Sequence, residues 1–185
     1  MSAPPQMRRA DKLMPDDRAM AVLEGGFCGR LAAIGADGYP YCVPLLYVLM
    51  DGELYVHNAG AAGHLKSAIG HEPRVCFEMD EPGEIFPYGR FECDTSVAFR
   101  SVIVFGKARI VEDAGVKQRF FRALMGKYAE GIGERPKDFF PRIDQITLYA
   151  IGIERMTGKE TPLPAVSDRW PAKDRTKSPG ARLPS

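Results

Sequence analysis

The chain has 185 residues, of which 45% are hydrophobic and 26% are charged, and its formal net charge at pH 7 is +1. A chain of this length fits one domain, because a single hydrophobic core commonly spans about 100 to 200 residues. The near-neutral charge excludes a general electrostatic attraction to nucleic acid or to an anionic membrane, so we expect no nucleic-acid or membrane partner and predict a small-molecule ligand.

The chain has no sequence signal for membrane insertion, export or disulfide bonding. Its apolar runs are shorter than the roughly 18 residues of a membrane helix, and residues 1–15 lack the apolar stretch of a signal peptide. The four cysteines contain no C-x-x-C pair, which is typical of reduced thiols, and we expect a cytoplasmic protein. Proline-rich, basic ends predict an N-terminal arm at 1–15 and a C-terminal tail at 161–185, flanking one domain at 16–160.

The domain is predicted to begin with a helix and a β-hairpin. A helix over 16–24 starts at aspartates that can cap it and ends at a pair of glycines. Strands over 27–36 and 39–50 flank Asp37-Gly38, a dipeptide that favours a hairpin turn. Two prolines in the second strand, Pro40 and Pro44, suit an edge strand or a bulge.

A third strand over 53–58 follows Asp51-Gly52, so the first three strands are expected to form an antiparallel meander. Next comes a helix over 63–71, which leads to a fourth strand over 74–80.

The remaining strands are predicted over 98–112 and 145–157, with an amphipathic helix over 113–129 between them. Residues 81–97 fit no period and are interpreted as a long loop beside the functional site, or as a surface that binds a second chain. Six strands with tight turns and peripheral helices predict a mainly β fold, a small six-stranded antiparallel barrel.

The connection from the third strand to the next helix is a candidate anion site. Residues 60–63 (Gly-Ala-Ala-Gly) have little side-chain bulk, and a helix that starts near Gly63 directs its free N–H groups towards them. Lys66 lies in the first helical turn and adds a positive charge. This pattern favours a bound phosphate; an ordinary strand–loop–helix connection with a solvated lysine is the alternative.

Other signatures of chemistry are missing from the sequence. The glycines and Lys66 do not match the P-loop spacing, and no G-x-G-x-x-G follows a strand. His57, His64 and His71 lie seven residues apart without an acidic residue at ligand spacing, which argues against a metal site. No serine or cysteine occupies a nucleophile elbow.

Five segments, taken together and in order, resemble the pyridoxamine-phosphate-oxidase-like FMN-binding split barrels, and among them the nitroimidazole-resistance (Nim) type of flavin-nucleotide-binding protein. The segments are GRLAAIGADGYPYCVPLLYV, LYVHNAGAAGHLK, RVCFEMD, FRSVIVFGKA and MTGK. The resemblance runs from about residue 16 to residue 160. It implies a homodimer of six-stranded split barrels, with two FMN molecules in clefts between the chains.

The resemblance also implies which residues surround the cofactor. Those expected beside the isoalloxazine ring are Val43, Pro44, Leu45, His57, Asn58 and Ala59. Those expected to hold the phosphate are Gly63, His64 and Lys66. Arg100 and Ser101 correspond to positions near the cofactor and the dimer seam, and His57 corresponds to a histidine implicated in the active site of Nim-type relatives. Phe99 departs from the tyrosine that relatives often carry.

These expectations lead to one main functional hypothesis and two alternatives. The main hypothesis is an FMN-dependent oxidoreductase that passes electrons from NAD(P)H to a small acceptor, with the flavin supplying the redox chemistry. The alternatives are a haem-binding split barrel with a histidine ligand, and a flavin carrier or sensor without enzymatic activity. FAD is the alternative flavin.

Overall fold

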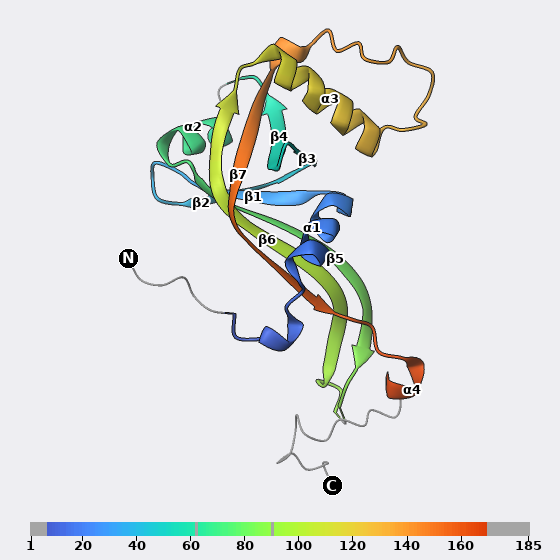
Figure 1. Ribbon diagram of the computed structural model, residues 1–185. Coiled ribbons are helices and arrows are strands. Elements are labelled where there is room, and N and C mark those ends of the chain that lie inside the picture. The colour runs from blue at the N-terminus through green and yellow to red at the C-terminus, as the bar shows by residue number, and fades with distance from the viewer. Residues whose placement is uncertain (1–6, 62, 90, 170–185) are drawn as a thin grey trace.

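The computed structural model describes residues 7–61, 63–89 and 91–169, with Asp168 and Arg169 described by backbone alone. Figure 1 shows a strongly curled sheet with helices against it. All pairings are antiparallel, and the strand order is β2-β1-β5-β6-β7-β4-β3. Most of the predicted tail, including Trp170, the chain's only tryptophan, lies outside the described residues.

The elements follow in chain order. They are η1 Ala10–Lys12, α1 Asp16–Gly25, β1 Gly29–Ile34, β2 Pro40–Leu45, β3 Tyr47–Met50, β4 Glu53–Ala59, α2 His64–His71, β5 Arg74–Pro87, β6 Thr95–Val111, α3 Ala114–Tyr128, η2 Ile143–Gln145, β7 Ile146–Thr161 and α4 Val166–Arg169. None of the described helices is long and apolar enough to cross a membrane.

The predicted strand over 39–50 is two strands, which corrects the strand count from six to seven. The chain leaves the sheet at Leu46; β2 pairs with β1 and β3 pairs with β4, so β2 and β3 occupy opposite edges of the sheet. The expected three-stranded meander is therefore wrong. The apolar run over 39–50 continues through Leu46, so the sequence gives no signal that the chain passes there from one edge of the sheet to the other. The edge position predicted from Pro40 and Pro44 is confirmed.

The predicted loop over 81–97 is mostly an extension of the sheet. β5 continues to Pro87 and pairs with the start of β6, with a register shift between Pro82 and Ile85. A proline and a glycine within this stretch disguise the alternation of a strand, because they are typical of loops. The long β5–β6 hairpin forms the arm at the bottom of Figure 1.

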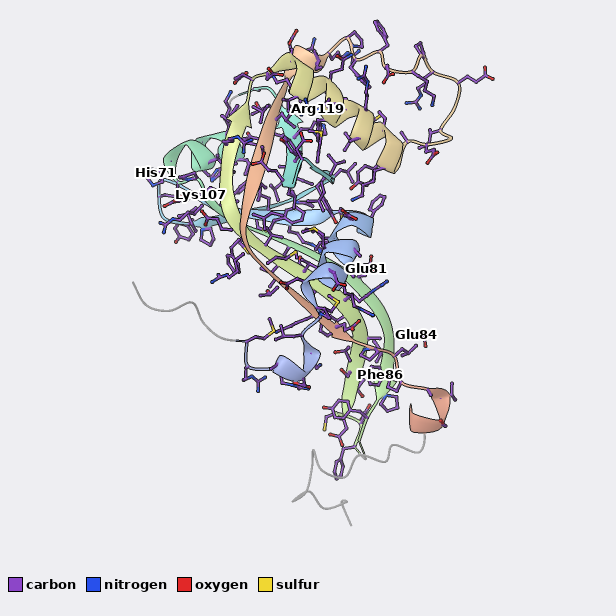
Figure 2. The ribbon with its side chains drawn as sticks, viewed as in Figure 1. His71, Glu81, Glu84, Phe86, Lys107 and Arg119 are labelled. Carbon is purple, nitrogen blue, oxygen red and sulfur yellow. The ribbon has the colours of Figure 1, made fainter. Side chains whose placement is uncertain are left out.

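The sheet encloses one hydrophobic cluster and carries a second on its outer side. α1 and α2 contribute Leu23 and Leu65 to the inner cluster, and α3 lays Phe120 and Leu124 on the outer one. The largest fully buried side chains include Tyr47, Tyr149, Phe77, Phe120, Leu23 and Leu31. Figure 2 shows these helices with the side chains drawn: α1 lies against the long strands near the middle of the molecule, and α3 lies beside β4 at the end away from the arm.

Gly106 of β6 leaves no room for a side chain against β7, and it gives a test of this packing. A Cβ at Gly106 would lie 2.1 Å from the carbonyl oxygen of Gly152, so we expect Gly106→Ala to lower the free energy of unfolding by about 1 to 3 kcal/mol. Gly70→Ala is the matched control, since its Cβ would meet nothing within 4 Å and alanine favours a helix by up to about 1 kcal/mol. Urea denaturation of both variants measures the difference; equal stabilities would contradict the close contact.

Candidate functional site

The loop between β4 and α2 leaves the start of the helix open. Gly60 donates its N–H to the carbonyl oxygen of Gln145 at 2.8 Å, and a Cβ on Gly60 would lie at the same distance from that oxygen, so the loop packs here only with glycine. Gly63 is the N-cap and provides no side-chain hydrogen bond. Among the described residues, the backbone N–H groups of 64–66 have no acceptor, which suits them to bind an anion.

Two basic side chains stand on this first turn of α2. The predicted start of the helix near Gly63 is confirmed. Lys66 is half-buried and forms no ion pair with the described residues. The exposed His64 ring stacks on Tyr41 of β2, with centroids 4.4 Å apart and planes 29° apart. The structure thus brings Gly63, His64 and Lys66 together on one turn.

A small cavity of about 230 Å³ lies beside His64, between α2 and the β1–β2 turn. Asp37 lines it, and its carboxylate accepts a hydrogen bond from the N–H of Tyr39 at 3.1 Å. A carboxylate at this position repels an anion. An anion is therefore better accommodated on the Lys66 side of the turn than in this cavity.

His57 and Asn58 point to opposite faces of β4, because neighbouring side chains alternate along a strand. The His57 ring lies among aromatic rings of α3, 5.3 Å from Phe120 and 5.8 Å from Phe121 between centroids. Its Nδ1 is buried and has no hydrogen-bond partner among the described residues. Burial lowers the pKa of His57, so the ring is held in its neutral form.

Asn58 faces the inner side of the sheet, where its Oδ1 accepts a long hydrogen bond of 3.4 Å from the hydroxyl of Tyr149. Its amide nitrogen has no partner among the described residues. Ala59, the last residue of β4, is exposed next to the loop that leads into α2. Asn58 and Ala59 therefore adjoin the helix start, whereas His57 does not share their face.

The predicted ring-binding segment of β2 also divides between two faces. Val43 and Leu45 pack against the inner core, and Pro44 is exposed on the outer face. What the three share is an edge strand, whose backbone groups on one side face no neighbouring strand.

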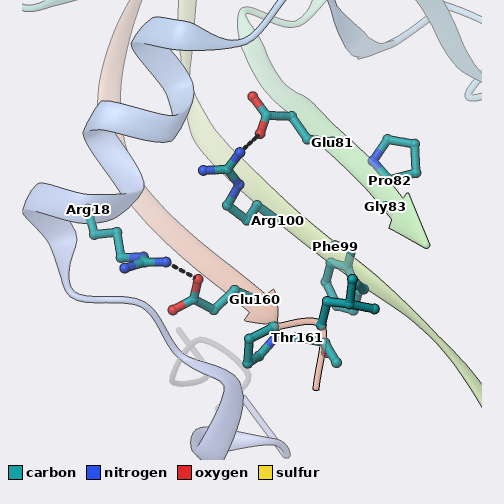
Figure 3. A pocket seen from close by; sticks show the side chains of 11 residues that line it. Arg18, Glu81, Pro82, Gly83, Phe99, Arg100, Glu160 and Thr161 are labelled. Carbon is teal, nitrogen blue, oxygen red and sulfur yellow. Dashed lines mark hydrogen bonds and ion pairs between the residues drawn. The ribbon is translucent and has the colours of Figure 1, made fainter. Parts of the chain in front are cut away.

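Arg100 and Ser101 lie at the arm end of β6, away from the start of α2 and from His57, but only three strands from Pro44, which aligns with Ile103 through Arg30 and Glu78. Arg100 forms an ion pair of 2.6 Å with Glu81 on the arm, beside a cavity of about 430 Å³ that Phe99 and Glu160 also line. Figure 3 shows this pair opposite the Arg18–Glu160 pair. Val111 of β6 pairs with Leu148 of β7, which pairs with His57 of β4, so Val111 marks the level of His57. The path along β6 from Ser101 to Val111 is roughly 30 Å, at about 3.3 Å per residue. One chain therefore holds two separate groups of predicted residues.

Several contacts of these residues have no individual signal in the sequence. Tyr41 stacks on His64, and Phe120, Phe121 and Phe140 form the aromatic cluster beside His57. The helical spacing around Phe120 predicts a buried stripe, but which strand this stripe covers depends on how α3 docks.

The fold and motifs match known proteins. Residues 15–160 match the family model described as pyridoxamine 5'-phosphate oxidase, and the chain belongs to this family. The search of curated proteins found no match.

Solved structures show the same fold at low sequence identity. A putative 5-nitroimidazole antibiotic resistance protein from Bacteroides thetaiotaomicron is 19% identical with a TM-score of 0.65, over 80% of this chain and 85% of that one. The flavocytochrome Anf3 from Azotobacter vinelandii is 20% identical with a TM-score of 0.71, over 88% and 77%. A FAD-binding protein from Mesorhizobium loti is 24% identical with a TM-score of 0.59, over 81% and 97%.

The burial of His57 predicts a pH-dependent stability. Because its pKa is lowered in the folded chain, the unfolded chain binds more protons as the pH falls through about 6.5, the ordinary histidine value. The stabilisation is therefore complete above pH 6.5 and is lost below it. We expect His57→Phe to reduce the loss of stability between pH 8 and pH 5, measured by urea denaturation. The control His71→Asn changes an exposed histidine and should keep the wild-type loss; an unchanged loss in His57→Phe would contradict a neutral, buried ring.

Proposed function

We propose that this member of the pyridoxamine 5'-phosphate oxidase family binds FMN and transfers electrons from NAD(P)H to a small acceptor. The observation that carries the proposal is the uncapped start of α2, where glycines expose backbone N–H groups beside Lys66. A FAD-binding protein and a flavocytochrome are among the structural relatives, which supports a flavin as the cofactor.

The residues at the start of α2 fit the phosphate of a flavin nucleotide. A helix N-terminus contributes about 0.3 to 1 kcal/mol to anion binding, and each charge-assisted hydrogen bond contributes about 1.5 to 3 kcal/mol. Lys66 and the free N–H groups of the first turn therefore suffice for the anion. His64 adds a ring nitrogen, although its stacking on Tyr41 restricts its orientation.

The residues proposed for the ring system adjoin this phosphate site on two strands. Asn58 and Ala59 end β4 directly before the loop, and Asn58 has a free amide nitrogen that can donate to a ring acceptor. The backbone of Val43, Pro44 and Leu45 offers edge-strand groups, of which Pro44 supplies only a carbonyl.

A homodimer is part of the proposal, because the Ser101 and His57 levels of the sheet lie at opposite ends of β6. The path along the strand between them is roughly 30 Å, at about 3.3 Å per residue. The outer face of the sheet, opposite the core, also carries side chains that no described helix covers. These include Ala32, Cys42, Cys76, Ile103 and Phe105. A second copy on this face would cover them and would also meet Ser101, which shares this face with Ile103 and Phe105, whereas Arg100 points to the α1 side of β6.

The chain's contribution to the reaction would be binding, orientation and electrostatics. A bound flavin supplies hydride or electron transfer. Lys66 and the first-turn N–H groups would hold the phosphate. The amide of Asn58 would fix the ring edge. His57 is the candidate group for holding or releasing a proton, and because it faces the other side of β4, this role requires the reacting atoms to reach the α3 side of the strand.

Haem binding is the second candidate, and the orphaned nitrogen of His57 favours it. The two phenylalanine rings packed on His57 oppose it, because they occupy the space beside the imidazole. A flavin carrier or sensor would use the same site without turnover.

The decisive experiment is performed on the purified protein. Absorption separates flavin from haem, and the mass of the released cofactor separates FMN from FAD. Light scattering of the loaded protein should give twice the chain mass, and NAD(P)H oxidation with a small acceptor separates an enzyme from a carrier. A loaded protein that contains haem alone, or that takes up no flavin, rules out the proposal.

We expect Lys66→Ala to weaken FMN binding by about one to two decades, because it removes a charge-assisted contact of roughly 1.5 to 3 kcal/mol. Fluorescence titration of the cofactor-free protein measures the dissociation constant. Arg119→Ala is the matched control, since Arg119 lies on α3 and pairs with Asp51 at 2.6 Å, away from α2. An unchanged dissociation constant for Lys66→Ala would reject the phosphate role.

His57→Ala tests the proposed proton-handling role. If His57 is catalytic, the variant should retain FMN and lose at least about 100-fold in turnover, the lower range for acid–base catalysis. The measurement is steady-state NAD(P)H oxidation by the FMN-loaded variant. Turnover at the wild-type rate would exclude catalysis, and loss of FMN would assign the residue to binding.

A further inference from the structure

A third cavity lies on the opposite side of α3 from the core. It has a volume of about 640 Å³ and lies between α3 and the segment that leads back to β7, which Figure 1 shows as a long excursion of the chain beside the helix. Its volume falls within the range of about 300 to 1,000 Å³ that is common for small-molecule sites.

The cavity is lined by apolar side chains that the chain leaves uncovered. Met125 is 40% exposed, Ile132 is 53% exposed and Phe139 is 66% exposed, and all three line the same space. Phe140 also lines the cavity, and its ring stacks on the ring of Phe121 with 5.2 Å between centroids. Apolar groups gathered around one hollow indicate a site for an apolar molecule.

The far wall of the cavity is tied to the helix by an ion pair. Arg122 of α3 contacts the carboxylate of Asp138 at 2.8 Å. Asp138 has a φ of 57°, a left-handed conformation that is uncommon for a residue other than glycine. The Arg122–Asp138 ion pair therefore holds the segment after α3 in a specific conformation at the cavity wall.

The charges at the rim select the sign of a ligand. Arg122 and Asp138 neutralise each other, which leaves Arg135 and Lys137 against Glu130, none of them in an ion pair with another described residue. The excess is one positive charge. A ligand with a single negative charge complements this rim, and a cationic one does not.

We propose that this cavity binds a small amphiphile with an apolar body and one carboxylate, of the class of medium-chain carboxylic acids. The apolar body lies against Met125, Ile132 and Phe139, and the carboxylate lies at the rim beside Arg135 and Lys137. The cavity shares no residue with the proposed flavin site, so this proposal does not depend on the proposed function.

Displacement of 1-anilinonaphthalene-8-sulfonate from the full chain tests the proposal. Decanoate should displace the dye, and decyltrimethylammonium should not at the same concentration. Ile132→Glu should weaken decanoate binding at least about tenfold, and Arg135→Gln should weaken it about tenfold, the loss expected for one charge-assisted contact. Arg135→Gln should leave the binding of decanol unchanged.

Two control variants locate the effect. Ile85→Glu places the same charge on another exposed isoleucine, which lies on the arm and is 74% exposed. Arg142→Gln removes a cation close in the sequence that does not line the cavity. Both should bind decanoate as the wild type does. Equal binding of the cationic amphiphile, or unchanged binding by Ile132→Glu, overturns the proposal. So does a wild type that binds no dye while Ile132→Glu halves its mass in solution, because a second copy then covers the cavity.

Discussion

The close contact of β6 and β7 at Gly106 is the constraint on which the other features depend. These two strands run the length of the molecule and belong both to the barrel end and to the arm. Phe105 pairs with Arg155 and Gly106 pairs with Ile153, so Glu154 is the extra residue of a bulge. The bulge lets β7 change which residues face inward.

The spacing of the apolar residues in β7 changes at this bulge. Tyr149, Ile151 and Ile153 alternate, and the next inward residue is Met156, three positions on instead of two. Without the extra residue, the second half of the strand would turn its apolar side chains outward. The bulge thus keeps one continuous core while the sheet curls, and the curl sets where α1, α2 and α3 can pack.

Prediction from the sequence succeeded for elements that depend on local residue preferences. It failed for elements whose position depends on how the sheet curls. The helix start at Gly63 and the hairpin at Asp37-Gly38 follow from residues that favour one backbone conformation, and both are present. The crossing at Leu46 has no such signal, because the apolar run continues through it. The β5–β6 extension was missed for the opposite reason, since Pro82 and Gly83 are typical of a loop but lie at an irregularity that the sheet absorbs.

The same distinction holds for the candidate site. The resemblance implies Gly63, His64 and Lys66 as one group, and a single helical turn does join them. It also implies His57 and Asn58 on the same side of the cofactor, but strand alternation separates their side chains. The separation has a chemical consequence. A ligand on the Asn58 face meets the inner end of the sheet near Tyr149, whereas the His57 nitrogen lies on the α3 face within an aromatic cluster.

Phe121 of α3 links His57, on the outer face of β4, to the cavity of about 640 Å³ beside α3. Phe121 contacts the His57 ring on one side and stacks on Phe140 on the other, and Phe140 lines the cavity. Because side chains in a close-packed cluster leave one another little free volume, Phe140 limits the space of Phe121, and Phe121 limits the space of the His57 ring. The buried Nδ1 of His57 therefore depends on the docking of α3 and of the segment that follows it, and not on β4 alone.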